Sequence, residues 1–259
     1  MNQHLLDYQK NGYAIFKSIP TSSLLELKET FVNMTKNSYF RYIGKPNGPL
    51  EEDYVINKMF IELENKNHKF VTKIFDSIRL TTSFLNVINS PDHISHCKNL
   101  LQVDESVDLF INSMSMRMDP PGSKEFSYGW HTDADVNISN SIFIQAWIPL
   151  VDIYEELGGL EIIENSHTKE IKTEHTDTIK KSVKDGNTYT DPLVYRTPHN
   201  TKVITPGAKE KTLTANFGQT IFFSNKLMHR SGLNLTQNKV RLASTAFYHR
   251  SDLNDTDWY

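Results

Sequence analysis

The chain has 259 residues, 38% of them hydrophobic and 11% aromatic, which is enough for one large domain with a sizeable core. Its formal net charge of −3 lacks the basic surplus of a nucleic-acid-binding protein, and its single cysteine, Cys97, excludes an internal disulfide and fits a reducing compartment. No signal peptide or apolar run of about 18 residues is visible, so we expect a cytoplasmic protein without a membrane partner.

The first hundred residues are expected to be mainly helical. An apolar stretch predicts an opening strand, and apolar residues at helical spacing predict the helices behind it. The expected elements are a strand at 12–16, a helix from 21, a loop at 41–53, one or two helices within 70–88 and a short helix from 91 to about 101. We expect this helical part, about residues 1–105, to buttress a sheet.

Short strands separated by Gly and Pro turns dominate the rest of the chain, about residues 106–259. The expected strands are 107–118, 141–151, 160–163, 202–204, 213–217, 220–223 and 240–249, with a hairpin through Gly218 joining the fifth to the sixth. Residues 168–212 are expected to form a polar insert. We therefore predict one domain over residues 1–259, mainly β with α, in which antiparallel strands form a sandwich or barrel behind a helical layer.

A histidine and a carboxylate two residues apart can bind one metal ion, and the chain contains His-Thr-Asp twice, at 131–133 and 175–177. On extended backbone the first and third side chains lie on one face. His131 and Asp133 precede the most apolar predicted strand, which can hold them rigidly. The second pair lies in the polar insert with no buried strand on either side. We therefore predict that His131 and Asp133 are the metal ligands.

A third ligand must come from farther along the chain, because non-haem Fe(II) oxygenases hold iron with two histidines and one carboxylate. The candidates are His199, His229 and His249. His229 follows a predicted strand, and Arg241 comes twelve residues later on the next one. Arginine suits the distal carboxylate of an oxo-acid co-substrate because its planar fork donates two parallel hydrogen bonds. His199 lies in the insert, and no later strand follows His249, so we favour His229.

These residues resemble the phytanoyl-CoA dioxygenase-like family of Fe(II)/2-oxoglutarate-dependent oxygenases. The matching motifs are at 8–15, 117–122, 130–133, 146–150, 158–167 and 229–236, followed by Arg241. The resemblance implies a double-stranded β-helix, or jelly roll, with Fe(II) bound by His131, Asp133 and His229. It also implies 2-oxoglutarate as co-substrate, with its distal carboxylate on Arg241 and Trp147 lining its pocket.

The resemblance implies an oxidoreductase that uses Fe(II), 2-oxoglutarate and O₂ to hydroxylate a small molecule, releasing succinate and CO₂. Thr132, where the family often has Gln, is a further candidate for co-substrate binding. The motif at 229–236 is similar to that in enzymes of bacterial glycan and natural-product pathways, which favours a sugar or another polar metabolite. Two alternatives stay open: another metal-dependent jelly-roll enzyme, such as an isomerase or lyase, and a non-catalytic binding protein. Nothing in the sequence defines the oligomeric state.

Three more residues are candidate substrate contacts, each with a structural alternative. Arg117 is either a paired core charge or a contact to substrate or co-substrate. Tyr128 is either hydrophobic support for the metal site or a substrate contact. Gln145 alternates with Trp147 on one strand face, so packing inside the barrel and pocket lining both fit. The polar insert could be a surface loop or a lid over the site, since long loops in compact domains are often functional.

Overall fold

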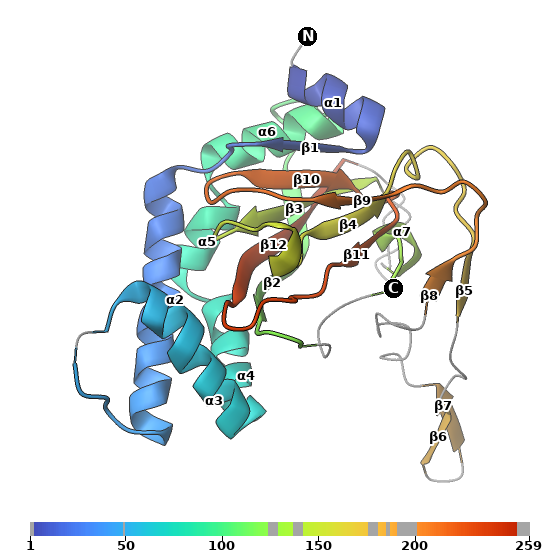
Figure 1. The fold of residues 1–259 in the computed structure, drawn as a ribbon. Coiled ribbons are helices and arrows are strands. Elements are labelled where there is room, and N and C mark those ends of the chain that lie inside the picture. The colour runs from blue at the N-terminus through green and yellow to red at the C-terminus, as the bar shows by residue number, and fades with distance from the viewer. Residues whose placement is uncertain are drawn as a thin grey trace.

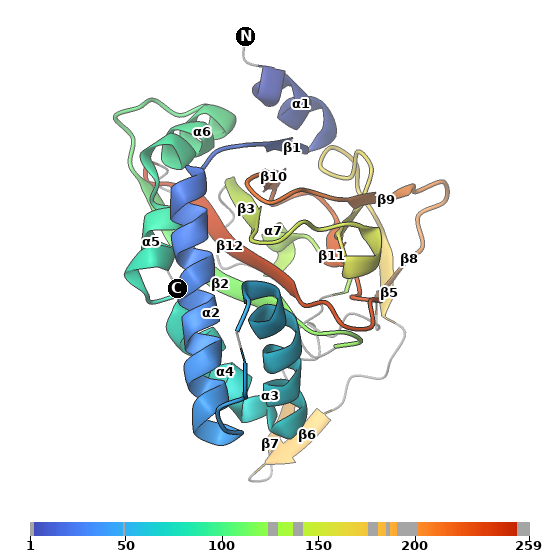
Figure 2. The same cartoon turned by 60° about the vertical axis from the view of Figure 1, so that its left-hand side comes forward.

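Helices form the N-terminal part of the protein and strands form most of the remainder (Figures 1 and 2). The computed structural model describes residues 3–48, 50–123, 129–136, 142–175, 181–184, 187–190 and 201–252. The N-terminal helices are α1 (Gln3–Asn11), α2 (Thr21–Tyr42), a π-helical turn (Tyr54–Met59), α3 (Phe60–Lys66), α4 (His68–Ile78), α5 (Thr82–Ile88) and α6 (Pro91–Leu101).

The predicted helices are confirmed, and the region 70–88 holds two of them, α4 and α5. The sequence did not predict α1, which has no fully buried residue and packs the partly buried Leu5 and Tyr8 against the core. Helix α2 begins directly behind Pro20 and buries one face, including Leu24, Leu27 and Phe31. The N-terminal part thus presents an apolar helical surface that needs a partner.

Its partner is a five-stranded antiparallel sheet in the order β1-β10-β3-β12-β2. These strands are β1 (Tyr13–Phe16), β2 (Leu109–Asp119), β3 (Phe143–Pro149), β10 (Thr220–Ser224) and β12 (Arg241–Arg250). A second antiparallel sheet, β11-β4-β9, consists of β4 (Leu160–Ile163), β9 (Glu210–Leu213) and β11 (His229–Ser231). Two smaller pairs join β5 (Thr173–His175) to β8 (Thr201–Val203) and β6 (Lys181–Lys184) to β7 (Asn187–Thr190).

The predicted hairpin through Gly218 is wrong. Strand β9 pairs with β4 in the smaller sheet, whereas β10 pairs with β1 and β3 in the larger one. The chain therefore crosses between sheets at this turn. Strand β9 (Glu210–Leu213) begins within the predicted polar insert of residues 168–212, so that boundary was placed too late. Apolar alternation identifies a strand, but the partner of that strand is chosen by packing.

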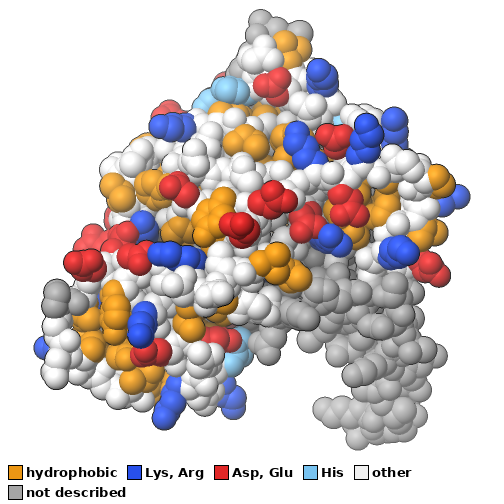
Figure 3. All heavy atoms as spheres, viewed as in Figure 1, with side chains coloured by type: hydrophobic (Ala, Val, Ile, Leu, Met, Phe, Trp, Pro, Cys, Tyr) orange, Lys and Arg blue, Asp and Glu red, His pale blue; other side chains and the backbone are white. Residues whose placement is uncertain are grey.

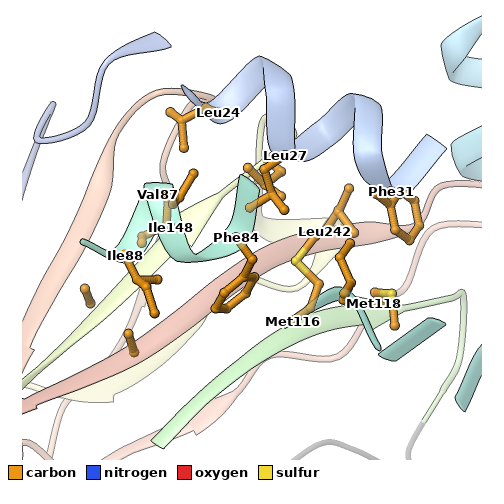
Figure 4. Packing of buried hydrophobic residues seen from close by; sticks show 14 of the residues in the cluster. Leu24, Leu27, Phe31, Phe84, Val87, Ile88, Met116, Met118, Ile148 and Leu242 are labelled. Atoms are coloured by element: carbon orange, nitrogen blue, oxygen red, sulfur yellow. The ribbon is translucent and has the colours of Figure 1, made fainter. Parts of the chain in front are cut away.

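Two apolar layers hold these elements together. One lies between the helices and the outer face of the five-stranded sheet, where Phe31 and Phe84 pack with Met116 and Leu242 (Figure 4). The other lies between the two sheets; its members are Trp147, Ile153, Leu157, Leu160, Ile162, Leu213, Ala215, Ile221, Phe223, Leu227 and Ala243. Because side chains alternate along a strand, β12 serves both layers, with Leu242 facing the helices and Ala243 facing the other sheet.

The surface carries charges of both signs. Acidic and basic side chains are interspersed over the face in Figure 3, in keeping with the net charge of −3. Among the described residues, no helix is both long and apolar enough to cross a membrane.

Candidate metal centre

Two of the predicted ligands lie side by side on facing backbone segments. His131 forms an isolated antiparallel bridge with His229, the first residue of β11. The His131 N–H donates to the His229 carbonyl at 3.0 Å, and the His229 N–H donates back to the His131 carbonyl at 2.9 Å. The two imidazole rings point the same way, with centroids 4.3 Å apart. Residues 98 positions apart in the sequence are thus brought into one site.

Asp133 completes the cluster from a short helix, α7 (Asp133–Val136), which a hydrogen bond from the Ala134 N–H to the Asn225 carbonyl (2.9 Å) joins to the end of β10. Its Oδ1 lies 3.8 Å from Nε2 of His131, and its Oδ2 lies 3.8 Å from Nε2 of His229. The expectation that residues 131 and 133 share a face of one extended strand is wrong, because the backbone turns into α7 between them.

Each histidine presents the same nitrogen to the cluster. Nδ1 of His131 lies 2.6 Å from the Gly129 carbonyl, and Nδ1 of His229 lies 2.8 Å from the Leu227 carbonyl. A carbonyl only accepts, so each Nδ1 carries the proton and each Nε2 keeps its lone pair for a ligand. This is the tautomer that a metal-binding histidine needs, fixed by a backbone acceptor behind the ring.

Burial disfavours the charged forms of both Asp133 and His229. It raises the pKa of Asp133 to about 6, against a smaller opposing effect of His131, and it lowers the pKa of His229 to about 4. Oδ2 of Asp133 is buried and accepts no hydrogen bond. A carboxylate without a donor is costly to bury, whereas a bound metal ion would satisfy it. Two imidazoles and one carboxylate, all within 4.8 Å of one another, therefore fit a divalent metal.

No other group of three such side chains converges in the described part of the chain. Of the alternative triplet, His175 ends β5, while Asp177 lies outside the described residues, as does His199. His249 stacks between Phe110 and Phe143, with ring centroids 4.8 and 4.2 Å away.

Arg241 lies on β12 directly opposite Asp119 of β2. Its guanidinium donates hydrogen bonds to groups within the protein. Nε and Nη2 donate to Oδ2 of Asp119 at 3.0 and 2.9 Å, and Nη1 donates to the carbonyls of Gly158 and Gly232. Four of its five N–H groups are therefore used. The edge of the guanidinium expected to bind a co-substrate carboxylate donates instead to one oxygen of Asp119, which leaves one N–H on Nη2.

Asp119 is a site residue that the sequence analysis missed. Its Oδ1 also accepts from Nη2 of Arg117 at 3.0 Å, so one buried carboxylate joins both arginines. Although burial raises the pKa of Asp119, the two guanidinium groups outweigh this effect and lower it. The sequence could have indicated Asp119, because alternation along a strand puts residues 117 and 119 on the same face.

Gly158 and Gly232 make room for Arg241. Gly158 has a φ of +92°, and a Cβ there would lie 2.7 Å from the Gly232 carbonyl oxygen and 2.8 Å from Nη1 of Arg241. We expect Gly158→Ala to lower the free energy of unfolding by about 3 kcal/mol, as the sum of backbone strain and these clashes. Gly207→Ala is the control for urea denaturation, since Gly207 has a φ of +75° but open space around it. Equal losses in both variants would contradict the packing argument.

Three of the remaining predicted residues, Thr132, Gln145 and Trp147, lie in the described part of the chain. Trp147 is buried between the sheets, and Gln145 is 9% exposed, with an Oε1 that accepts no hydrogen bond. Gln145 is paired with Phe223 across β3 and β10, and the Phe223 ring packs edge-on against His229 at 4.8 Å. Thr132 is half-buried and lies in the sequence between His131 and Asp133. Tyr128 lies outside the described residues.

Comparison with known proteins identifies one family. A family model described as Phytanoyl-CoA dioxygenase (PhyH) matches residues 8–243. No curated protein matches the sequence.

Several solved structures are similar to this chain at low sequence identity, so the likeness shows a shared fold. The epimerase SnoN, in complex with Fe3+, alpha ketoglutarate and nogalamycin RO, is 13% identical over 95% of this chain and 82% of its own, with a TM-score of 0.58. The alpha ketoglutarate dependent carbocyclase SnoK is 14% identical (97% and 85% covered, TM-score 0.57). EvdO2 from Micromonospora carbonacea var. aurantiaca, complexed with 2-oxoglutarate, is 15% identical (98% and 94%, TM-score 0.53).

Proposed function

The chain belongs to the phytanoyl-CoA dioxygenase family, and from this premise we propose that it is an Fe(II)- and 2-oxoglutarate-dependent dioxygenase. The proposed reaction hydroxylates a small-molecule metabolite and releases succinate and CO₂. The observation that supports it most is the convergence of His131, Asp133 and His229, with both Nε2 atoms and an unsatisfied carboxylate oxygen directed at one point. As part of the proposal, the two sheets form a double-stranded β-helix within a single domain.

His131, Asp133 and His229 would hold the iron, which together with 2-oxoglutarate and O₂ would supply the oxidising chemistry. The protein's own contribution is to fix the ligands. The carbonyls of Gly129 and Leu227 hold the two imidazoles in the tautomer that binds metal. The buried Asp133 carboxylate would offset part of the charge of the bound metal.

The co-substrate would lie along the inner face of β12. Its distal carboxylate would accept the remaining Nη2 N–H of Arg241, which Asp119 and the two glycine carbonyls hold in one orientation. Trp147 from the neighbouring strand would form one wall of this pocket, and Thr132 would approach the metal-binding end. A single N–H from a fixed guanidinium orients a carboxylate but holds it less tightly than a two-bond fork.

The substrate is proposed to carry a hydrogen-bond donor near the reacting carbon. The buried Oε1 of Gln145 lacks a donor, and a buried acceptor without a partner is unfavourable. A hydroxyl or amino group of a bound metabolite would satisfy it, which agrees with a sugar or another polar compound. Arg117 and Tyr128 remain proposed substrate contacts.

The direct test is succinate formation from 2-oxoglutarate by the purified protein supplied with Fe(II) in air, across a panel of hydroxylated metabolites. We expect turnover that stops when Fe(II) is chelated or O₂ is removed, because the reaction consumes both. Product analysis then separates hydroxylation from outcomes such as the epimerisation and ring closure named for SnoN and SnoK. A metal-loaded protein that neither binds 2-oxoglutarate anaerobically nor forms succinate with any compound would rule the proposal out.

A further inference from the structure

The outer face of the His131–His229 bridge carries a second pair of side chains. Trp130 precedes one metal ligand and Arg230 follows the other, so both point away from the cluster when the histidines point toward it. The Arg230 guanidinium lies over the Trp130 ring, 4.5 Å from its centroid. The two ligands and this cation–aromatic pair are therefore opposite faces of the same two backbone segments.

Arg230 is itself held from the neighbouring strand. Its Nε donates to Oε2 of Glu161 at 2.5 Å, and Glu161 is its register partner on β4. A longer contact of 3.5 Å joins Nη2 to Glu210 on β9. The guanidinium is thus stacked on one side and paired at its edge, an arrangement suited to its flat shape.

The Trp130 side chain helps to hold the described residues directly before His131 in place. The bridge joins His131 to the first residue of β11 through two backbone hydrogen bonds, and among the described residues no strand continues from its His131 side. The Trp130 side chain is 4% exposed and packs with Ile163 and Met228, and Arg230 covers it. A shift of Trp130 would move His131 with it, since the two residues are adjacent.

We propose that Arg230 is a positioning residue for the metal centre, which it stabilises by holding Trp130, and through it His131, from the outer face of the bridge. The inference rests on the proposed metal-dependent function. It requires that Arg230 influence metal affinity although it offers no metal ligand. A residue acting only on global stability would instead lower the melting temperature and leave affinity per folded molecule unchanged.

The experiment is titration of the apoprotein with Co(II), followed by its visible absorption, together with thermal unfolding of each variant. We expect Arg230→Ala to raise the Kd for Co(II) about tenfold, the lower end of what loss of an indirect support for a metal ligand costs. Arg230→Lys should recover part of the loss, because an ammonium can still lie over the ring but cannot form the flat stack. Glu161→Gln should produce a smaller rise than Arg230→Ala.

Lys211→Ala is the matched control. Lys211 lies 5.5 Å from the centroid of the Tyr13 ring and on the same small sheet, but neither residue of that pair adjoins a metal ligand. An unchanged Kd in Arg230→Ala, or an equal rise in Lys211→Ala, would overturn the inference. If Arg230→Ala does not fold, the order of Kd values for wild type, Arg230→Lys and Glu161→Gln decides, and three equal values overturn it. A wild-type protein that binds no Co(II) would instead refute the proposed function.

Discussion

Asp133→Ala is expected to abolish metal binding and succinate formation together. Asp133 supplies the only carboxylate of the described cluster, with its oxygens 3.8 Å from Nε2 of both histidines. Removing it leaves two neutral imidazoles, which hold a divalent ion poorly. We expect metal affinity to fall by more than about a hundredfold, beyond the range typical for residues that only support a ligand.

The same substitution should not lower the free energy of unfolding of the metal-free protein. The Asp133 carboxylate is buried with an oxygen that accepts no hydrogen bond, so its removal relieves an unfavourable burial. Urea denaturation of the apoprotein should therefore give a free energy of unfolding equal to or above that of wild type. Asp252→Ala is the control, because Asp252 is an exposed acid paired with Arg250. Wild-type turnover by Asp133→Ala would remove Asp133 from the site.

In contrast to Asp133→Ala, Arg241→Ala is expected to lower the free energy of unfolding. The substitution empties the space between Gly158 and Gly232 and removes three hydrogen-bonding nitrogens from the protein interior. It also leaves Asp119 buried with one of its two arginine partners, Arg117. Breaking a buried ion pair by removing one member typically costs about 3–5 kcal/mol. Urea denaturation should show a loss of this size.

A second variant separates this structural role from co-substrate binding. Arg241→Lys keeps the positive charge but cannot reach Asp119 and the two glycine carbonyls at once. If the free Nη2 N–H binds 2-oxoglutarate, the apparent KM for 2-oxoglutarate should rise about tenfold while kcat changes little, since the lost contact is a binding interaction. An unchanged KM in a folded variant would make Arg241 a purely structural residue and move the co-substrate anchor elsewhere.

Much of the local structure was predictable because it depends on short-range pattern. Pro91 and the apolar spacing behind it define a helix that runs from Pro91 to Leu101, as predicted. The strand at 160–163 was likewise predicted with its exact bounds, between a Gly-Gly turn and a polar stretch. Pairing was less predictable, since the supposed hairpin partners β9 and β10 lie in different sheets. Strand partners depend on which apolar faces meet, and a linear pattern does not contain that information.

The predicted convergence of His131, Asp133 and His229 is present in the structure, whereas the predicted local geometry around them was wrong. His131 and Asp133 do converge with His229, but Asp133 does so from a helix, and His131 is held by a bridge to β11 instead of a following strand. Backbone carbonyls fix the tautomers of His131 and His229, and the Trp130–Arg230 pair packs on the outer face of their bridge. Such contacts leave no signature in residue type, so only the folded chain reveals them.

By itself, the sequence determined which residue types are available for the proposed metal site: two histidines, an aspartate, and an arginine twelve positions after the second histidine. The tertiary structure decided how they are used. It places residues 131 and 229 in one bridge, and it sets Asp119 against Arg241 across a strand pair. That second pairing limits Arg241 to one free N–H, because a buried guanidinium must satisfy its donors within the protein before it can offer one to a ligand.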